Sequence, residues 1–433
     1  MRQLGTLVLL SLTLSPRVAQ AQTADPRAEW LTRNSTPIRT LEFDAQNDDD
    51  LAAIGRAVGS KRIVFLGEAT HGDGGTFQAK ARIIRYLHER LGFDLLVFES
   101  GFYDCRRTWL NALDGMALVD SAASCMFPLW AHSEQVEPLL RFLDAQKDGP
   151  HPLELAGMDF QPSGTGFALL PSDLARFVSG QPNHAELQSA LQRVDGMISL
   201  LLRDARGIRA ITDHYWTAFQ EAILDLVHNA RTVVEGMGDL GEPGFWQQAL
   251  SGFDAFVTFI VTMDPAHPDP AVFNRRDSVM AANLLWLARQ RPDRKIVVWG
   301  ATSHFIRERS GIEGDPTPNM VPAGHLVSKA LGAEAYVLGF LATEGELGFA
   351  NRATGAEAQA IPVADHATLE GAWAATGYRM AFLDLRSRRD GDDWLHATLT
   401  ARPLGYAPMS AVWPDHLDGF FWIRRMTPST VHP

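Results

Sequence analysis

Five ionisable side chains lie at or just after the ends of predicted strands, and their types suit acid–base chemistry. They are Glu68, His71, Glu99, Asp159 and His304. The carboxyl ends of parallel strands meet at one edge of a sheet, where open α/β folds bind their ligands. Carboxylates and imidazoles gathered at that edge have the chemistry to activate a water molecule or to hold a metal ion.

The leading interpretation is a hydrolytic site in which a histidine activates water directly. His71 would be the general base, and Glu68 or Glu99 would orient its ring and stabilise the imidazolium that forms. His304 or Arg82 would polarise a carbonyl oxygen or stabilise a developing oxyanion. This interpretation requires no cofactor.

A divalent metal ion is the alternative use of the same atoms. Two histidines and two carboxylates could hold one cation that lowers the pKa of a bound water, although their spacing matches no compact metal motif. The candidate ligands are Glu68, His71, Glu99 and His304. In either case we expect Arg82 and Asp159 to contact the substrate.

Missing motifs exclude several other kinds of site. The chain contains no G-x-S-x-G nucleophile elbow, no H-E-x-x-H zinc motif and no C-x-x-C pair. The glycine-rich turn around His71 matches neither of the glycine patterns that cradle phosphates, and the carboxylate of Glu68 would repel a phosphate.

A strand–turn–helix–strand unit would position the first three of these residues. Residues 62–66 and 94–98 are short apolar runs typical of buried strands, and residues 76–91 have apolar side chains at helical spacing. A helical crossover of this length makes the two strands parallel. The glycine-rich turn before the helix then places His71 beside the end of the first strand.

The rest of the chain predicts an α/β fold with a largely parallel central sheet and flanking helices. Further strands are expected at residues 151–160, 295–299, 335–341 and 379–385, and further helices at 51–58 and 130–144. Residues 184–290 are mainly helical in pattern and would form a lobe over the carboxyl edge of the strands. Residues 102–126 and 162–182 are expected to be irregular.

The first residues have the pattern of a secretory signal peptide. Arg2 precedes an apolar run at residues 4–14, and Ala19-Gln20-Ala21 is an A-x-A cleavage site, so we expect residues 1–21 to be removed. The mature protein, residues 22–433, is expected to be one domain in the periplasm or outside the cell. No later run is long and apolar enough to cross a membrane.

The charge composition argues against one class of binding partner. The formal net charge is −12, and no basic patch or lysine run is present, which argues against nucleic acid as a partner. A small-molecule ester is the expected partner, and the oligomeric state is left open. The two cysteines, Cys105 and Cys125, are expected to form one disulfide in an oxidising compartment.

Several segments resemble the erythromycin esterase family, some of whose members are labelled for succinoglycan biosynthesis. They are GEATHG at 67–72, GMDFQ at 157–161, RDSVMAANLLW at 276–286, KIVVWGATSH at 295–304, AYVLGF at 335–340 and FLDLR at 382–386. The resemblance implies an α/β fold with a helical lobe over a cleft, and hydrolysis of a macrolide lactone by a histidine base. It places Glu68 and His71 on the G-E-x-x-H pair, Glu99 on the strand-end glutamate and His304 on the second histidine of the later motif.

The later motif departs from the family pattern. It usually reads W-A-H-N-x-H, whereas here Ala301 replaces the first histidine and Thr302 replaces the asparagine. The resemblance therefore supports a hydrolase more strongly than it supports a macrolide substrate. A non-catalytic, ligand-binding relative is the remaining alternative.

Overall fold

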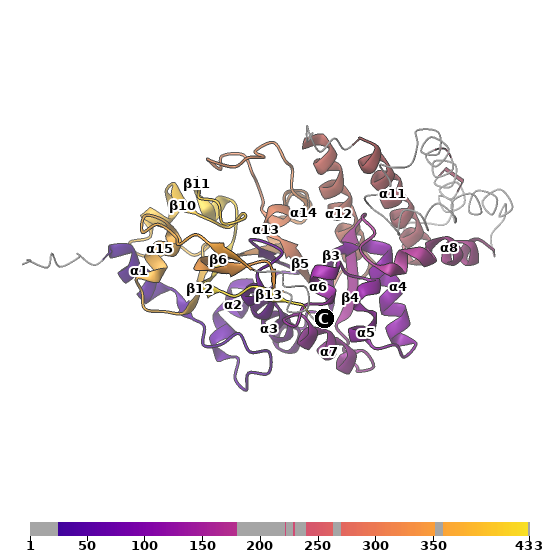
Figure 1. The fold of residues 1–433 in the computed structure, drawn as a ribbon, viewed down its shortest axis with the longest axis horizontal. Helices are drawn as coiled ribbons and strands as arrows, with labels where there is room; N and C mark the ends of the chain where they lie inside the picture. The colour runs from indigo at the N-terminus through magenta and orange to yellow at the C-terminus, as the bar shows by residue number, and fades with distance from the viewer. Residues whose placement is uncertain are drawn as a thin grey trace, which may run out of the picture.

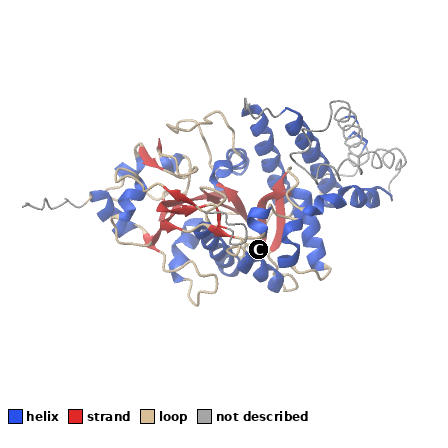
Figure 2. Ribbon diagram, in the orientation of Figure 1, coloured by secondary structure: helices blue, strands red, loops and turns tan. Residues whose placement is uncertain are grey.

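The protein is built on one nine-stranded sheet with helices on both faces (Figures 1 and 2). The structure is a computed structural model that describes residues 25–179, 240–262, 270–350 and 358–431, together with residues 221, 228 and 229. The strands lie in the order β1-β9-β12-β6-β2-β5-β3-β4, and β8 pairs with β6. The six strands from β12 to β4 are all parallel, whereas β1, β9 and β8 pair antiparallel.

The strands of this sheet have the following bounds. They are β1 Thr36–Pro37, β2 Ile63–Glu68, β3 Leu95–Gly101, β4 Glu154–Asp159, β5 Ile296–Ala301, β6 Ala335–Leu347, β8 Gln359–Ile361, β9 Met380–Asp384 and β12 Gly419–Met426. Two short pairs lie outside it, β10 (Leu399–Ala401) with β11 (Met409–Ala411), and β7 (Phe349–Ala350) with β13 (Ser429–Thr430).

The sheet separates two hydrophobic cores because successive side chains of a strand point to opposite faces. In β2, Ile63 and Phe65 belong to one core, whereas Val64 and Leu66 belong to the other. All four are fully buried. Strands buried on both faces need a continuous apolar run, which explains why β2, β3 and β5 were recognisable in the sequence.

The helices divide between the same two faces (Figure 1). One core is covered by α2 (Ala52–Val58), α3 (Gly74–Leu91), α5 (Leu118–Ser121), α6 (Pro128–Ala131) and α7 (Glu137–Gln146). The other is covered by α1 (Pro26–Asn34), α8 (Leu170–Ser179), α11 (Gly241–Thr262), α12 (Pro270–Gln290), α14 (Ala323–Leu331) and α15 (Leu369–Ala374). Helix α4 (Phe102–Leu113) contributes to both cores, and the short α13 (Thr302–Phe305) follows β5.

The strand order creates a switch in chain direction at β2. The chain leaves β2 through α3 on one face to reach β3, and it later returns through α12 on the other face to place β5 between them. The carboxyl ends of β2, β5 and β3 are therefore neighbours, although the strands are far apart in sequence. Such a switch point is where α/β sheets form their binding crevice.

The predicted α/β class and largely parallel sheet are confirmed, and so are all six predicted strands, with shifts of a few residues. Two predictions of irregular structure are wrong: the segment 102–126 contains α4 and α5, and 162–182 contains α8. Strand β12 was missed, although it lies between β6 and β9 within the sheet. Its two consecutive arginines, Arg424 and Arg425, are exposed at its far end and interrupt the apolar run.

The predicted helical lobe is described only in part. Residues 241–262 and 270–290 are helical, as predicted, whereas most of 180–239 and the expected signal peptide lie outside the described residues. Among the helices that the structure describes, none combines the length and the apolar character that a bilayer crossing demands.

Arg82 occupies a structural position, which corrects its assignment to substrate binding. Its side chain is 1% exposed, and its guanidinium donates to Asp50 Oδ1 at 2.7 Å, to Asp48 Oδ1 at 3.1 Å and to the Thr40 carbonyl at 2.8 Å. These contacts tie α3 to the segment before α2. The same two carboxylates keep the pKa of Arg82 raised although burial opposes this.

Replacing Arg82 with alanine should therefore destabilise the fold. Asp50, whose side chain is 2% exposed, would be left without its closest cation, and loss of one partner of a buried ion pair typically costs about 3–5 kcal/mol. Arg39→Ala is the matched control, because Arg39 pairs with the same Asp50 but is 54% exposed, and it should cost less than about 1 kcal/mol. Chemical denaturation measures both, and equal effects would contradict this interpretation.

Candidate active site

The turn after β2 is held in shape by glycines that have no room for a side chain. A Cβ on Gly67 would lie 2.7 Å from Thr302 Oγ1, one on Gly72 would lie 2.3 Å from the Gly348 nitrogen, and one on Gly74 would lie 2.3 Å from the Pro428 carbonyl oxygen. The obstacles at Gly72 and Gly74 are backbone atoms that cannot move aside. The end of β2 therefore packs against Thr302 at the start of α13, and the turn packs against the segments around residues 348 and 428.

Asp73 braces the same turn from inside. Its carboxylate accepts from the Thr70 backbone nitrogen at 3.0 Å and from the Thr70 hydroxyl at 2.8 Å, and it is fully buried. Burial raises the pKa of Asp73 to about 6 although the Thr70 hydrogen bonds oppose this. The Gly405 nitrogen also donates to the Ala69 carbonyl at 3.0 Å, so that a distant loop closes over the turn.

His71 projects from this turn with Nδ1 held by a carboxylate and its side chain partly exposed. Its Nδ1 lies 3.1 Å from Glu68 Oε1, and its ring packs edge-on against Trp130 with centroids 5.3 Å apart. The His71 side chain is 40% exposed, whereas Glu68 is fully buried. No hydrogen-bond partner of Nε2 is found among the described residues. This geometry suits a base that takes a proton on Nε2 while Glu68 stabilises the resulting imidazolium.

Lys80 balances the charge of Glu68. It lies on α3, is fully buried, and its Nζ contacts Glu68 Oε2. The same Nζ donates to the Gly300 carbonyl at 2.9 Å and lies 4.7 Å from the centre of the Trp299 ring. Burial lowers the pKa of Lys80 well below its ordinary value, whereas the carboxylates of Glu99 and of the contacting Glu68 favour its charged form.

Glu99 is buried at the end of β3, beside a β-bulge. Its Oε2 accepts from the Ala301 nitrogen at 2.9 Å, and its Oε1 lies 2.9 Å from an Arg276 nitrogen and 3.3 Å from His304 Nε2. Burial alone would raise the pKa of Glu99, but His304 and Arg276 outweigh it and lower this pKa to about 2. Glu99 is therefore a carboxylate at any physiological pH.

Arg276 joins the ends of β3 and β4. It lies on α12 and donates to Asp159 Oδ2 at 2.6 and 3.0 Å as well as to Glu99. Asp159 is fully buried, so its contact with Arg276 compensates a charge that would otherwise be costly. The carboxylates of Asp159 and Glu99 raise the pKa of Arg276 against the effect of burial.

His304 is held by a carboxylate that was not among the predicted residues. Its Nδ1 lies 2.9 Å from Asp277 Oδ1, which also accepts from the Ala323 nitrogen at 2.9 Å. Burial would lower the pKa of His304, but Asp277 and Glu99 outweigh it and raise this pKa. These carboxylates favour the protonated form of the ring, whereas Arg276, with a nitrogen 3.3 Å from Nε2, opposes it.

These residues form one cluster with two halves, Glu68 with His71 and Lys80 on one side and Glu99 with Arg276 and His304 on the other. The two halves meet at the end of β5. Ala301 is in register with Glu68 across β2 and β5, and its nitrogen donates to Glu99. Gly300 accepts from Lys80, and a Cβ on Gly300 would lie 2.6 Å from Glu99 Oε2. This position therefore requires glycine, because the carboxylate of Glu99 occupies the space.

The structure thus brings together all five strand-end residues of the sequence analysis and separates Arg82 from them. It adds Lys80, Arg276 and Asp277, which the site prediction did not include. A signal for two of these was present, since Arg276 and Asp277 form a charged pair within the helical block 276–286. The disulfide between Cys105 and Cys125 is confirmed.

The cluster does not suit a divalent metal ion. Cations already lie among its carboxylates, because Lys80 contacts Glu68 and Arg276 contacts Glu99 and Asp159. Within the described parts of the chain, no group of three or more histidine, cysteine or acidic side chains is arranged to hold a metal. The candidate ligands Glu68, His71, Glu99 and His304 instead contact one another or these cations.

Substitution of Gly72 by alanine should destabilise the turn. The new Cβ would meet backbone atoms of Gly348 at 2.3 Å, and overpacking of this kind typically costs about 1–3 kcal/mol. Gly252→Ala in α11 is the control, because its nearest contact is an ordinary 3.5 Å and alanine is favoured over glycine within a helix by roughly 0.5–1 kcal/mol. Thermal or chemical unfolding should show changes in unfolding free energy of opposite sign for the two variants. An unchanged stability of Gly72→Ala would contradict the tight packing of this turn.

Glu99 should make the stability depend on pH in the acidic range. Its pKa is about 2 in the folded protein against an ordinary 4.5, so its contribution is present above pH 4.5 and is lost as pH falls toward 2. The difference in unfolding free energy between wild type and Glu99→Gln should therefore shrink by about 2 kcal/mol between pH 6 and pH 3. The exposed Glu89→Gln is the control, and a difference that stays constant with pH would disprove the ionised, cation-bound state of Glu99.

Comparison with known proteins assigns the chain to a family. Its sequence matches the model of the erythromycin esterase family over residues 88–426. This range contains Glu99, Asp159, Arg276 and His304, whereas Glu68 and His71 precede it. The chain is also 27% identical over 450 residues to YbfO of Bacillus subtilis, provisionally named as a hydrolase, with 98% of this chain and 97% of YbfO covered.

Solved structures share the fold at low sequence identity. A Bacillus cereus protein aligns with a TM-score of 0.77 and 21% identity over 94% of this chain and 98% of its own. A succinoglycan biosynthesis protein aligns with a TM-score of 0.75 and 18% identity over 93% and 97%. A histidine-to-asparagine mutant of erythromycin esterase EreC, in its open conformation, aligns with a TM-score of 0.65 and 15% identity over 90% and 98%.

The family match spans well over half of the chain, and the shared fold agrees with it. These findings support a hydrolase. The chain belongs to the erythromycin esterase family.

Proposed function

We propose that this protein hydrolyses a carboxylic ester of a small molecule with water activated by His71. The observation that carries the proposal is the pairing of His71 Nδ1 with the buried Glu68 while the ring remains 40% exposed. A base needs one nitrogen accessible to water and the other fixed by an acceptor, and the paired Nδ1 and partly exposed side chain of His71 support this role.

The reaction divides between the two halves of the cluster. His71 Nε2 takes a proton from water, and the hydroxide oxygen attacks the ester carbonyl. Glu68 stabilises the imidazolium through Nδ1, and the imidazolium then returns its proton to the leaving alcohol. The products are a carboxylic acid and an alcohol, and no cofactor is consumed.

The cationic half of the cluster is suited to the developing oxyanion. Arg276 and His304, whose protonated form the carboxylates favour, are held in place by Glu99, Asp159 and Asp277 before any substrate binds. A preorganised positive charge stabilises a tetrahedral intermediate without reorganisation during the reaction. In this proposal Glu99 orients these cations, and Asp159 contributes to the substrate site through Arg276.

The similarity to erythromycin esterase EreC makes a macrolide lactone one ester to test. We propose the class of substrate, a carboxylic ester, and no particular ester. Ala301 stands where the family motif has a histidine, in register with Glu68, so a methyl group replaces the imidazole of the motif at this position. We also propose export with cleavage after Ala21. The Cys105–Cys125 disulfide supports this proposal, because such bonds persist in oxidising compartments.

The test is hydrolysis of p-nitrophenyl acetate and of erythromycin by the purified protein and by His71→Ala. Loss of a general base should lower kcat/KM for a hydrolysed ester by about 10²–10⁴-fold. His151→Ala is the matched control, because His151 is exposed and precedes the amino end of β4, away from the carboxyl ends of the strands. Equal turnover by wild type and His71→Ala would reject the assignment of His71.

Two further outcomes separate the alternatives. The assay is repeated after exhaustive chelation with metal content measured, and activity that disappears with the metal would favour a metal-dependent hydrolase. Binding of the macrolide without turnover of any ester in the panel would favour a ligand-binding relative.

A further inference from the structure

The end of β3 is not held by the sheet at the point where it carries Glu99. Strand β3 pairs with β4 in regular register up to Phe98 and Gly157, and the pairing resumes only at Gly101 and Asp159, so that β3 has one extra residue. A bulge of this kind interrupts the ladder and turns a side chain toward a new direction. Other contacts must therefore fix the position of Glu99.

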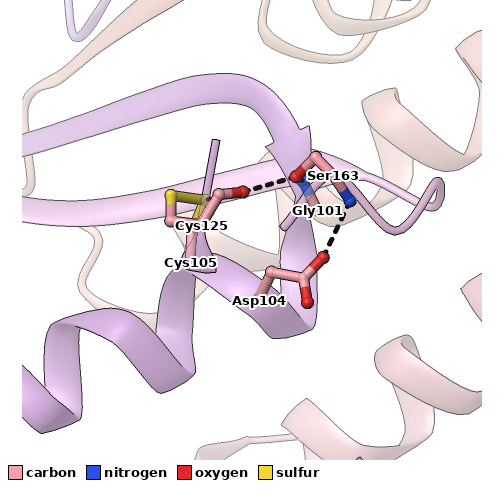
Figure 3. Close-up of a disulfide and its surroundings, with 5 residues drawn as sticks. All are labelled: Gly101, Asp104, Cys105, Cys125 and Ser163. Carbon is pink, nitrogen blue, oxygen red and sulfur yellow. Dashed lines mark hydrogen bonds between the residues drawn. A yellow bond between two sulfur atoms is a disulfide. The ribbon is translucent and has the colours of Figure 1, made fainter. Parts of the chain in front are cut away.

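Ser163 supplies a bridge across this gap (Figure 3). Its hydroxyl accepts from the Gly101 nitrogen at 2.6 Å and donates to the Cys125 carbonyl. Its own backbone nitrogen donates to Asp104 Oδ2 at 3.0 Å. The loop after β4 is thereby joined to the last residue of β3 and to the first turn of α4.

The disulfide anchors the far side of this bridge. Cys105 lies beside Asp104 on α4, and its bond to Cys125 fixes the carbonyl that Ser163 contacts (Figure 3). Both sulfur atoms belong to fully buried residues. A Cβ on Gly164 would lie 2.3 Å from the Ser124 carbonyl, so the loop sits directly against the backbone that precedes Cys125.

Two glycines show how closely these parts fit. A Cβ on Gly101 would lie 2.2 Å from Asp104 Oδ2, and a Cβ on Gly157 would lie 2.4 Å from the carbonyl oxygens of Ser100 and Gly101. The bulge therefore packs against β4 without space to shift. Both strand ends bear a carboxylate that binds Arg276, namely Glu99 and Asp159.

We propose that Ser163 is a positioning residue, anchored by the Cys105–Cys125 disulfide, that sets Glu99 and Asp159 around Arg276. The full site is then assembled only in the oxidised protein. Reduction by a dithiol would break the S–S bond, add two electrons and two protons to give two thiols, and convert the dithiol to its own disulfide. This inference rests on the proposed function for its effect on catalysis, but its effect on geometry is independent of it.

The experiment compares Ser163→Ala and the double variant Cys105→Ala/Cys125→Ala with wild type. The matched control is Ser172→Ala, which removes a serine hydroxyl bonded to the Leu169 carbonyl at 2.9 Å on an exposed turn of the same segment. With p-nitrophenyl acetate as probe, we expect kcat to fall by about 10–100-fold in both test variants, since small displacements of catalytic groups have effects of that size. KM and the control should change little.

A second readout follows the site without requiring turnover. The ring of His304 is titrated by NMR in histidine-labelled protein, with His304→Gln for assignment. Glu99 helps to keep the pKa of His304 raised, so displacement of Glu99 should lower this pKa in the two test variants relative to wild type and to Ser172→Ala. Unfolding curves of each variant establish that the comparison is made on folded protein.

The outcomes separate the two proposals. Lowered kcat together with a lowered His304 pKa supports the inference. A wild-type titration and wild-type kcat in both test variants would overturn it, and an effect of Ser163→Ala alone would overturn the anchoring role of the disulfide. If wild type fails to hydrolyse the probe, the proposed function fails for that ester, whereas the His304 titration still decides whether Ser163 positions Glu99.

Discussion

Compensation of buried carboxylates by cations from both faces of the sheet is the constraint on which this structure depends. Glu68, Glu99 and Asp159 are each at most 1% exposed at the ends of β2, β3 and β4. A buried charge without a partner is strongly unfavourable. Lys80 from α3 reaches this edge from one face and Arg276 from α12 reaches it from the other. The sheet and its two helical layers are thus connected through the charges of the candidate site.

This arrangement leaves one side chain of the cluster distinct from the rest. His71 is 40% exposed, while its partner Glu68 is fully buried and contacts Lys80. Burial and opposing charges shift the pKa values of Lys80, Glu99 and His304 in different directions. Titratable groups pushed apart in this way are common at catalytic sites. The proposal that His71 is the general base therefore rests on its exposed side chain as well as on the shifted pKa values of the neighbouring groups.

Regular secondary structure alone does not hold the cluster together. The β3–β4 ladder is interrupted beside Glu99, and the turn that bears His71 has no regular structure of its own. Contacts between distant segments fix the backbone at both points. The turn is enclosed by the backbone around Gly348 and Pro428, while Ser163 and Cys125 hold the end of β3. Loops supported by a rigid sheet in this manner are frequent carriers of function.

The sequence by itself determined the α/β class, the strands with their apolar runs, the residues at the strand ends and the cysteine pair, because these depend on local pattern and compartment. It named Arg82 for the site and did not name Lys80, which contacts Glu68 in the structure. The two are separated by about 200° around α3, and only packing selected Lys80 to face the strand ends and Arg82 to face Asp50. Nor could it predict that Arg276 binds Asp159 or that β12 lies between β6 and β9. Both depend on contacts between segments that are far apart in the chain. Those pairings were decided by the tertiary structure, where every buried charge must find a partner that no local pattern specifies.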